Sequence, residues 1–198
     1  LLKSSDAPLN LKPVNLNLYL ENLCSSIRMR LQNTEIQFRY ELDPEPVNSM
    51  IDTEKFDLLI FNLLSNSCIY TNPGNEIKLT MKKNGDSYII TVSDKGVGIP
   101  NEHLRQIFEG FYSYDINKDG TSGIGIGLYL VDAIAKAHGG SCVINSSLNE
   151  GTTVSLRFPI KDTRSAFPEM RSPLPDYLSN KFSPLYIFLG EISGYHVF

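Results

Sequence analysis

The 198-residue sequence has no tryptophan, three cysteines and no long apolar run. Cys24, Cys68 and Cys142 are odd in number, far apart and without metal-ligand spacing, so neither a disulfide framework nor a zinc site is expected. No apolar run approaches the roughly 18 residues that a membrane-spanning helix needs, and no signal peptide is recognisable. These absences favour a domain that works in a reducing cytosol.

Positive charge is also scarce. The 18 basic and 22 acidic residues give a formal net charge of −4, and the basic residues form no run. Nucleic acid is therefore not expected as a partner. Because the chain starts at Leu1 without a methionine, we expect it to be a fragment of a longer protein, and a membrane anchor elsewhere in that protein stays open.

The 41% of hydrophobic residues is enough for one core of ordinary domain size. Apolar periodicity and turn residues predict helices over residues 16–31, 53–71 and 127–138, after Asn15 and Asp52 as N-caps of the first two. Alternating patterns predict strands over 36–42, 76–81, 88–92, 141–146 and 152–158, and a short extra strand over 47–51. We expect helical turns over 101–108 and a mobile loop over 113–121.

Three segments are expected along the chain. Residues 1–12 would be the end of a preceding helix or a linker, 13–160 the domain itself, and 161–198 an extension rich in proline and aromatic residues. No internal repeat is evident.

A glycine-rich segment leads into the third helix. Gly123, Gly125 and Gly127 stand at alternate positions, which lets the backbone approach a ligand with its N–H groups free. The helix that begins near Gly127 adds the positive end of its dipole. The segment suits a phosphate group, although glycine repeats also form plain flexible loops.

An amide stripe marks the second predicted helix. Asn62, Asn66 and Tyr70 are each four residues apart, so they lie on one side of the helix. Asparagine is a poor helix former, and two at one-turn spacing cost helix stability. The stripe indicates either a binding site or a solvated face.

Four blocks in a fixed order carry a family resemblance: residues 62–71, 94–100, 107–112 and 123–128. The series resembles the N, G1, F and G2 boxes of the ATP-binding catalytic domain of sensor histidine kinases, in the superfamily shared with gyrase, Hsp90 and MutL. The resemblance covers roughly residues 13–160. It implies an α+β two-layer sandwich of the Bergerat type, with a mixed sheet of about five strands and three helices on one face.

The resemblance implies ATP and Mg²⁺ as ligands. Asp94 would accept a hydrogen bond from the adenine amino group, Gly98 and Ile99 would lie against the ring, and Thr152 would support the base through a water. A buried carboxylate matches the donor of adenine but meets an acceptor in guanine, so ATP is expected to bind in preference to GTP.

By the same resemblance, Asn66 would be the Mg²⁺ ligand. Asn62 stands where hydrolysing relatives carry a glutamate that activates water; an amide cannot be a general base, so transfer to another nucleophile is favoured over hydrolysis. Asn62 and Asn66 are the expected catalytic residues. The other positions expected to line the nucleotide are Tyr70, Gly96, Phe108, Gly123, Gly125, Gly127 and Leu128.

Two departures from the family pattern stand out. Ile69 and Ser113 occupy positions where the family usually has a cation that touches phosphate, and Arg105 and Lys118 do not match those positions. Each missing cation would weaken phosphate binding by roughly tenfold or more. A degenerate nucleotide-binding or protein-interaction module is therefore the alternative to an active kinase, whereas Asn62 argues against a gyrase-like ATP-driven machine.

The acceptor histidine of the family lies in a separate helical hairpin. His103, His138 and His196 do not have its sequence context; we expect His103 to be a surface residue and His138 a cation at a helix C-terminus. The resemblance therefore implies three partners: a dimerisation and phosphotransfer domain upstream in the same protein, a second copy that dimerises through it, and a response regulator. The chain would be a cytoplasmic domain, compatible with a membrane-bound sensor protein.

Overall fold

The computed structural model describes residues 8–109, 112 and 125–161. Within these residues the chain forms three helices and seven strands. In chain order they are β1 Lys12–Asn15, α1 Leu16–Leu31, β2 Gln37–Leu42, β3 Asn48–Ile51, α2 Thr53–Tyr70, β4 Glu76–Asn84, β5 Ser87–Asp94, α3 Gly127–Ala137, β6 Ser141–Ser147 and β7 Gly151–Pro159.

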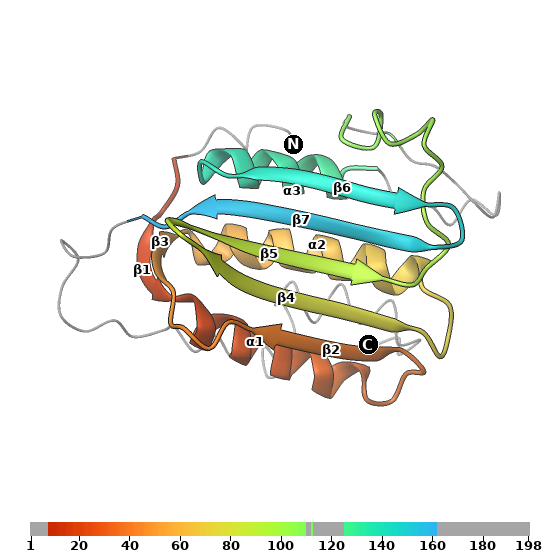
Figure 1. The fold of residues 1–198 in the computed structure, drawn as a ribbon, viewed down its shortest axis with the longest axis horizontal. Helices are drawn as coiled ribbons and strands as arrows, with labels where there is room; N and C mark the ends of the chain where they lie inside the picture. The colour runs from red at the N-terminus through yellow and green to blue at the C-terminus, as the bar shows by residue number, and fades with distance from the viewer. Residues whose placement is uncertain (1–7, 110–111, 113–124, 162–198) are drawn as a thin grey trace, which may run out of the picture.

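Five strands form the main sheet in the order β2-β4-β5-β7-β6. β2 is parallel to β4, and the other neighbours are antiparallel. All three helices lie behind the sheet in Figure 1, so the molecule has two layers. The expected mixed sheet with three helices on one face is thereby confirmed.

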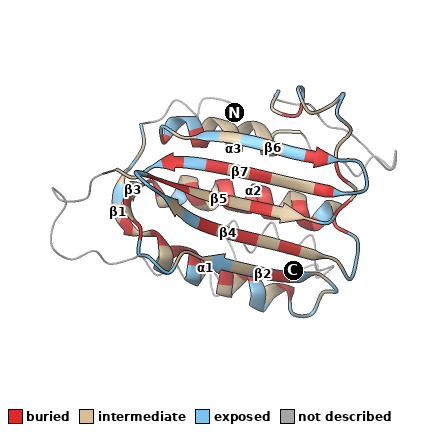
Figure 2. Cartoon of the chain, viewed as in Figure 1, coloured by how far each residue is buried: buried red, intermediate tan, exposed pale blue. Residues whose placement is uncertain are grey.

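The core lies between the sheet and the three helices, of which α2 is the middle one. In Figure 2 buried and less buried residues alternate along the central strands, as expected when one face packs on helices and the other faces solvent. The predicted core face of α2 is buried throughout: Phe56, Leu59, Ile60, Leu63, Leu64 and Ser67. α2 also packs against α3, which places the start of α3 beside the amide stripe.

A small second sheet joins the strand before α1 to the strand before α2. β1 pairs with β3 in antiparallel register, from Lys12 opposite Ile51 to Asn15 opposite Asn48. The sequence analysis did not anticipate β1, because four residues with a proline show no alternation and the partner strand is distant in sequence. The predicted helix start is confirmed: the Asn15 side chain accepts a hydrogen bond from the N–H of Leu18.

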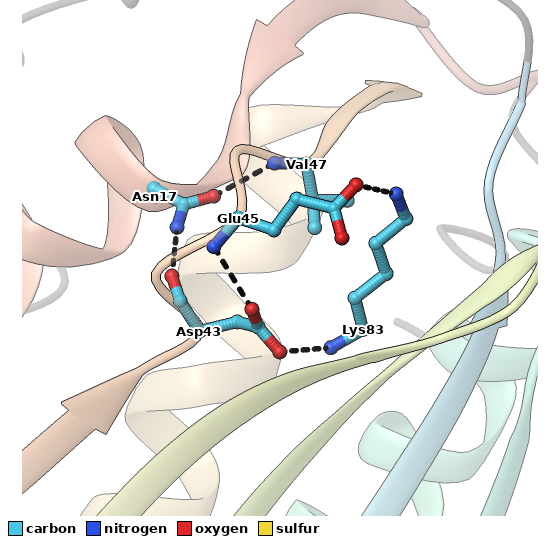
Figure 3. A network of polar contacts seen from close by, with 5 residues as sticks. All are labelled: Asn17, Asp43, Glu45, Val47 and Lys83. Atoms are coloured by element: carbon cyan, nitrogen blue, oxygen red, sulfur yellow. Dashed lines mark hydrogen bonds and ion pairs between the residues drawn. The ribbon is translucent and has the colours of Figure 1, made fainter.

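The turn between β2 and β3 is fixed by the polar network in Figure 3. The Asn17 amide donates to the Asp43 carbonyl at 2.7 Å and accepts from the N–H of Val47 at 2.9 Å. The Asp43 carboxylate accepts from the N–H groups of Glu45 and Lys83, which holds the pKa of that carboxyl below its usual range. The Lys83 ammonium pairs with Glu45. These contacts tie the first turn of α1 to β4.

His138 is not a cation, and that expectation was wrong. Its side chain is only 2% exposed, its Nε2 accepts the N–H of Asp52 at 3.1 Å, and its Nδ1 lies 2.9 Å from the Ile134 carbonyl, to which it donates. Burial lowers the pKa of the imidazole, and an Nε2 that accepts a hydrogen bond carries no proton. The neutral ring thus joins the end of α3 to the start of α2.

No helix in the described part of the chain combines the length and the apolar character needed to cross a membrane.

Candidate functional site

The predicted site residues gather at one end of the sandwich. This end holds the last turn of α2, the loop after β5, the start of α3 and the turn between β6 and β7, all at the right of Figure 1. The elements come from distant parts of the sequence, so the packing of α2 against α3 and the pairing of β5 with β7 bring them together.

Asp94 ends β5 and is held by three hydrogen bonds. Its Oδ1 accepts from the N–H groups of Gly96 at 3.0 Å and Thr152 at 3.2 Å. Its Oδ2 accepts from the Ser67 hydroxyl at 3.1 Å. Burial raises the pKa of the Asp94 carboxyl above its usual range, although these three bonds act in the opposite direction. The carboxylate is therefore held in one orientation and is partly removed from water.

The loop after Asp94 leaves no room for side chains at two glycines. A Cβ atom on Gly96 would lie 2.3 Å from the Tyr70 carbonyl oxygen. Gly98 has φ +69°, and its Cβ atom would lie 1.9 Å from the Ser147 carbonyl oxygen. The N–H of Val97 also donates to the Tyr70 carbonyl at 3.0 Å. The loop is thereby pressed between the end of α2 and the end of β6.

Ser146 links two more of the predicted site residues, Ile99 and Thr152, and sequence reasoning missed it. Its buried hydroxyl oxygen accepts the N–H of Ile99 at 2.8 Å, donates to the Gly151 carbonyl at 2.9 Å, and lies 2.9 Å from the Thr152 hydroxyl. A signal was available, because Ser146 falls on the inward side of the strand with Ile144.

The amide stripe of α2 faces the first turn of α3. A Cβ atom on Gly127 would lie 3.1 Å from Oδ1 of Asn62 and 3.5 Å from Nδ2 of Asn66. The Asn62 amide is buried and donates to the Leu58 carbonyl at 2.7 Å, whereas Asn66 is partly exposed. At Asn62 and Asn66 the stripe therefore lies against α3 instead of facing open solvent.

The other predicted positions border this region. Gly125 has φ +72°, and a Cβ atom there would lie 2.3 Å from the carbonyl oxygen of Tyr112. Leu128 and Phe108 are half-buried, and the first packs on the core. Residues 101–108 form a run of turns. Gly123, Ser113, Lys118 and the predicted loop over 113–121 lie outside the described residues.

A metal ion at this site would need ligands from elsewhere. In the part of the chain that the structure describes, no three His, Cys, Asp or Glu side chains are grouped to hold a metal ion. The partly exposed amide of Asn66 can supply one neutral oxygen beside Gly127. This donor set fits Mg²⁺, which commonly takes few protein ligands and completes its shell with phosphate oxygens and water.

Three comparisons place this arrangement among known proteins. The family model described as "Histidine kinase-, DNA gyrase B-, and HSP90-like ATPase" matches residues 51–162. The sensor protein SrrB of Staphylococcus aureus is 34% identical in an alignment of 140 residues that covers 65% of this chain and 24% of SrrB. The chain thus spans about a quarter of the length of the curated relatives it matches.

Solved structures show the same fold. The catalytic domain of the histidine kinase ThkA in a nucleotide-free form has a TM-score of 0.68 and 22% identity, over 78% of this chain and 100% of that one. ThkA in complex with the response regulator TrrA gives 0.62 and 21%, over 76% and 42%. Full-length ShkA in complex with AMPPNP gives 0.66 and 22%, over 78% and 32%.

Proposed function

We propose a kinase function for this chain. The premise is that the chain belongs to the histidine kinase-, DNA gyrase B- and HSP90-like ATPase family. In this proposal it is the ATP-binding catalytic domain of a two-component sensor histidine kinase. It binds Mg-ATP, and the γ-phosphate passes to a histidine of a separate dimerisation domain and then to a response regulator.

One observation carries the proposal. Asn66 and Ser67 are neighbours on α2, and they touch the two halves of the site: Asn66 lies beside Gly127, and Ser67 donates to Asp94. The carboxylate proposed to recognise the base is thereby hydrogen-bonded to the same helix that carries the phosphate-side amide. This arrangement suits a ligand that has a purine at one end and phosphates at the other.

At the adenine end, Asp94 supplies the acceptor. Its Oδ1 is engaged by two backbone N–H groups, and Oδ2 keeps a free lone pair beside the Ser67 hydroxyl. The 6-amino group of adenine satisfies that lone pair, whereas the 6-oxo group of guanine would leave two acceptors facing each other. The site therefore prefers ATP to GTP, and the loop around Gly98 and Ile99 lies against the base.

At the phosphate end, the chain supplies amides and backbone N–H groups. Bound Mg²⁺ would neutralise phosphate charge and polarise the γ-phosphate. Asn66 offers its amide oxygen to the ion, and the start of α3 at Gly127 directs N–H groups toward the phosphates. Asn62 cannot accept a proton from water, so the site holds the γ-phosphate for transfer to another nucleophile instead of hydrolysing it.

The acceptor histidine belongs to another domain in this proposal. His138 is buried in the joint between α2 and α3, and His103 is half-buried and contacts the Tyr112 hydroxyl. His196 lies outside the described residues. A response regulator as partner is supported by ThkA, which has been solved with the regulator TrrA. SrrB, a sensor protein of which this chain matches about a quarter, supports a longer parent protein that senses a signal. Dimerisation through its other domain is part of the proposal.

A second candidate function rests on Ile69. This side chain is apolar and 56% exposed in the last turn of α2, where the family usually has a phosphate-contacting cation. A domain that has lost such contacts would act as a weak nucleotide-binding or interaction module with little transfer activity.

Titration with AMPPNP separates the two candidates. The whole chain is titrated by calorimetry with excess Mg²⁺ and again with EDTA. The kinase proposal expects Mg²⁺-dependent binding that Asn66→Ala weakens by about tenfold. Ser65→Ala, a half-buried neighbour on α2, is the matched control and should leave affinity unchanged. Binding that depends neither on Mg²⁺ nor on the Asn66 side chain would favour the degenerate module. No binding at millimolar AMPPNP would contradict the kinase proposal and leave only a protein-interaction module.

A further inference from the structure

Ser67 contacts the base-recognising carboxylate from the core side. It lies in the last turns of α2, its side chain is only 5% exposed, and its hydroxyl donates to Oδ2 of Asp94 at 3.1 Å. The sequence pattern assigned Ser67 only to the core face. An alanine would satisfy that packing role, so the hydroxyl calls for a separate explanation.

The hydrogen bonds of Asp94 leave one acceptor position for a ligand. A carboxylate oxygen has two lone pairs. Oδ1 uses both, on the N–H groups of Gly96 and Thr152. Oδ2 uses one on Ser67 and keeps the other. A nucleotide base can therefore be recognised through Oδ2 alone.

We propose that Ser67 is a positioning residue for base recognition, whose hydroxyl fixes Oδ2 of Asp94 as the acceptor for a 6-amino purine. This inference rests on the proposed nucleotide site. The hydrogen bonds from the N–H groups of Gly96 and Thr152 fix the position of Oδ1. The hydrogen bond from the Ser67 hydroxyl to Oδ2 then prevents the carboxylate group from rotating. Without the hydroxyl, Oδ2 loses its fixed direction, and discrimination at position 6 of the purine weakens.

Protonation of Asp94 would reverse the preference. Two N–H donors face Oδ1, so a proton can add only to Oδ2. Oδ2 would then be a donor, which suits a 6-oxo purine and repels a 6-amino group. The Ser67 bond lowers the pKa of Asp94, so its loss extends the protonated form to higher pH. The titratable group that faces Asp94 from α2 is the Cys68 thiol, which burial keeps neutral by raising its pKa to about 12.

The test compares ATP with purine riboside triphosphate, which lacks the 6-amino group, by calorimetry on the whole chain. We expect the wild type to prefer ATP by about tenfold, the ratio that one hydrogen bond to a charged group supplies. Ser67→Ala should reduce ATP affinity by about tenfold and affinity for the analogue by less than about twofold, so that the ratio disappears. Ser67→Thr, which keeps a hydroxyl, should restore the ratio, and Ser65→Ala should not alter it.

A pH series adds an independent readout. ATP binding to Ser67→Ala should fall at a higher pH than in the wild type, and inosine triphosphate binding should rise there. Thermal unfolding without nucleotide shows whether each variant is folded; if Ser67→Ala is not, Ser67→Cys replaces it as a near-isosteric weak donor.

The outcomes separate this inference from the proposed function. A wild type that binds no ATP contradicts the nucleotide site itself, and the positioning role with it. A wild type that binds ATP, with a variant that loses both nucleotides equally and keeps its pH profile, overturns the positioning role alone.

Discussion

The adenine end and the phosphate end of the candidate site are built differently. At the adenine end, Asp94 receives three hydrogen bonds and Gly96 has no space for a side chain. At the phosphate end, Asn62 makes one side-chain bond to its own helix and Asn66 is partly exposed. In the proposed function, base recognition is thus assembled before the ligand arrives, whereas phosphate binding needs an added ion and backbone donors.

The two ends also differ in electrostatics. The proposed adenine end holds the half-buried carboxyl of Asp94, whose pKa is raised by desolvation. The described phosphate end has neutral amides and, at Ile69, an exposed apolar residue. A charge removed from water makes ligand binding specific but lowers the stability of the fold. Neutral amides add little specificity and cost little stability. Substitutions at the two ends should therefore have effects of different size and sign.

Asp94→Asn should have the largest effect. The new amide keeps an acceptor at Oδ1 for the two N–H groups but places an NH₂ donor toward the base. We expect ATP affinity to fall by about a hundredfold or more, since one hydrogen bond is lost and two donors face each other. Inosine triphosphate should instead bind more tightly, because its 6-oxo group accepts a hydrogen bond from the new NH₂ group. Calorimetric titration with both nucleotides measures the change, and Asp86→Asn on the exposed β4–β5 turn is the matched control.

The same variant tests what the half-buried charge of Asp94 costs in folding stability. The pKa of Asp94 is higher in the folded state than in the unfolded state. Asp94 therefore contributes to folding stability at pH values below its unfolded-state pKa, and this contribution is lost as the pH rises through its folded-state pKa. Asparagine never ionises and avoids that loss. The nucleotide-free variant should therefore unfold at no lower temperature than the wild type at pH 7. A large drop would show that the carboxylate is mainly structural.

Ile69→Lys should strengthen the weaker end. The Ile69 side chain is exposed, so little packing is lost, and a cation near the C-terminus of α2 also suits the helix dipole. A charge-assisted bond to phosphate would raise Mg-ATP affinity by about tenfold and leave adenosine affinity unchanged. Leu18→Lys, at a similarly exposed apolar residue of α1, adds the same charge elsewhere. An equal gain in both variants would mean that net charge alone is responsible.

Local patterns predicted most of the fold because they report which side of an element is buried. The predicted ranges of α1 and α2 agree with the structure to within one residue, and the Asn84-Gly85 hairpin lies between β4 and β5. The strand β1 was missed and the charge of His138 was wrong for a shared reason. Both depend on partners that are distant in sequence, β3 for the strand and Asp52 for the histidine.

The candidate site follows the same rule. Asp94, Asn62 and Asn66 were found because motif order and helical spacing mark them. Ser67 and Ser146 were missed because their roles come from long-range contacts, with Asp94 and with Ile99. No spacing rule reports that a serine on a core face donates to a carboxylate on another element.

The smallest expected effect is that of Gly127→Ala, at the contact between the two helices. Its Cβ atom would lie 3.1 Å from Oδ1 of Asn62, and the Asn62 amide is held by the Leu58 carbonyl, so the amide can yield only slightly. We expect Mg-ATP affinity to fall by about threefold, well under 1 kcal/mol, with adenosine affinity unchanged. Alanine favours a helix over glycine by about 1 kcal/mol, so thermal stability should not decrease. Equal losses of affinity for adenosine and for Mg-ATP would mean that α3 shifts as a whole and disturbs both ends. A loss of affinity confined to Mg-ATP would mean that the adenine end keeps its geometry when the phosphate end is altered.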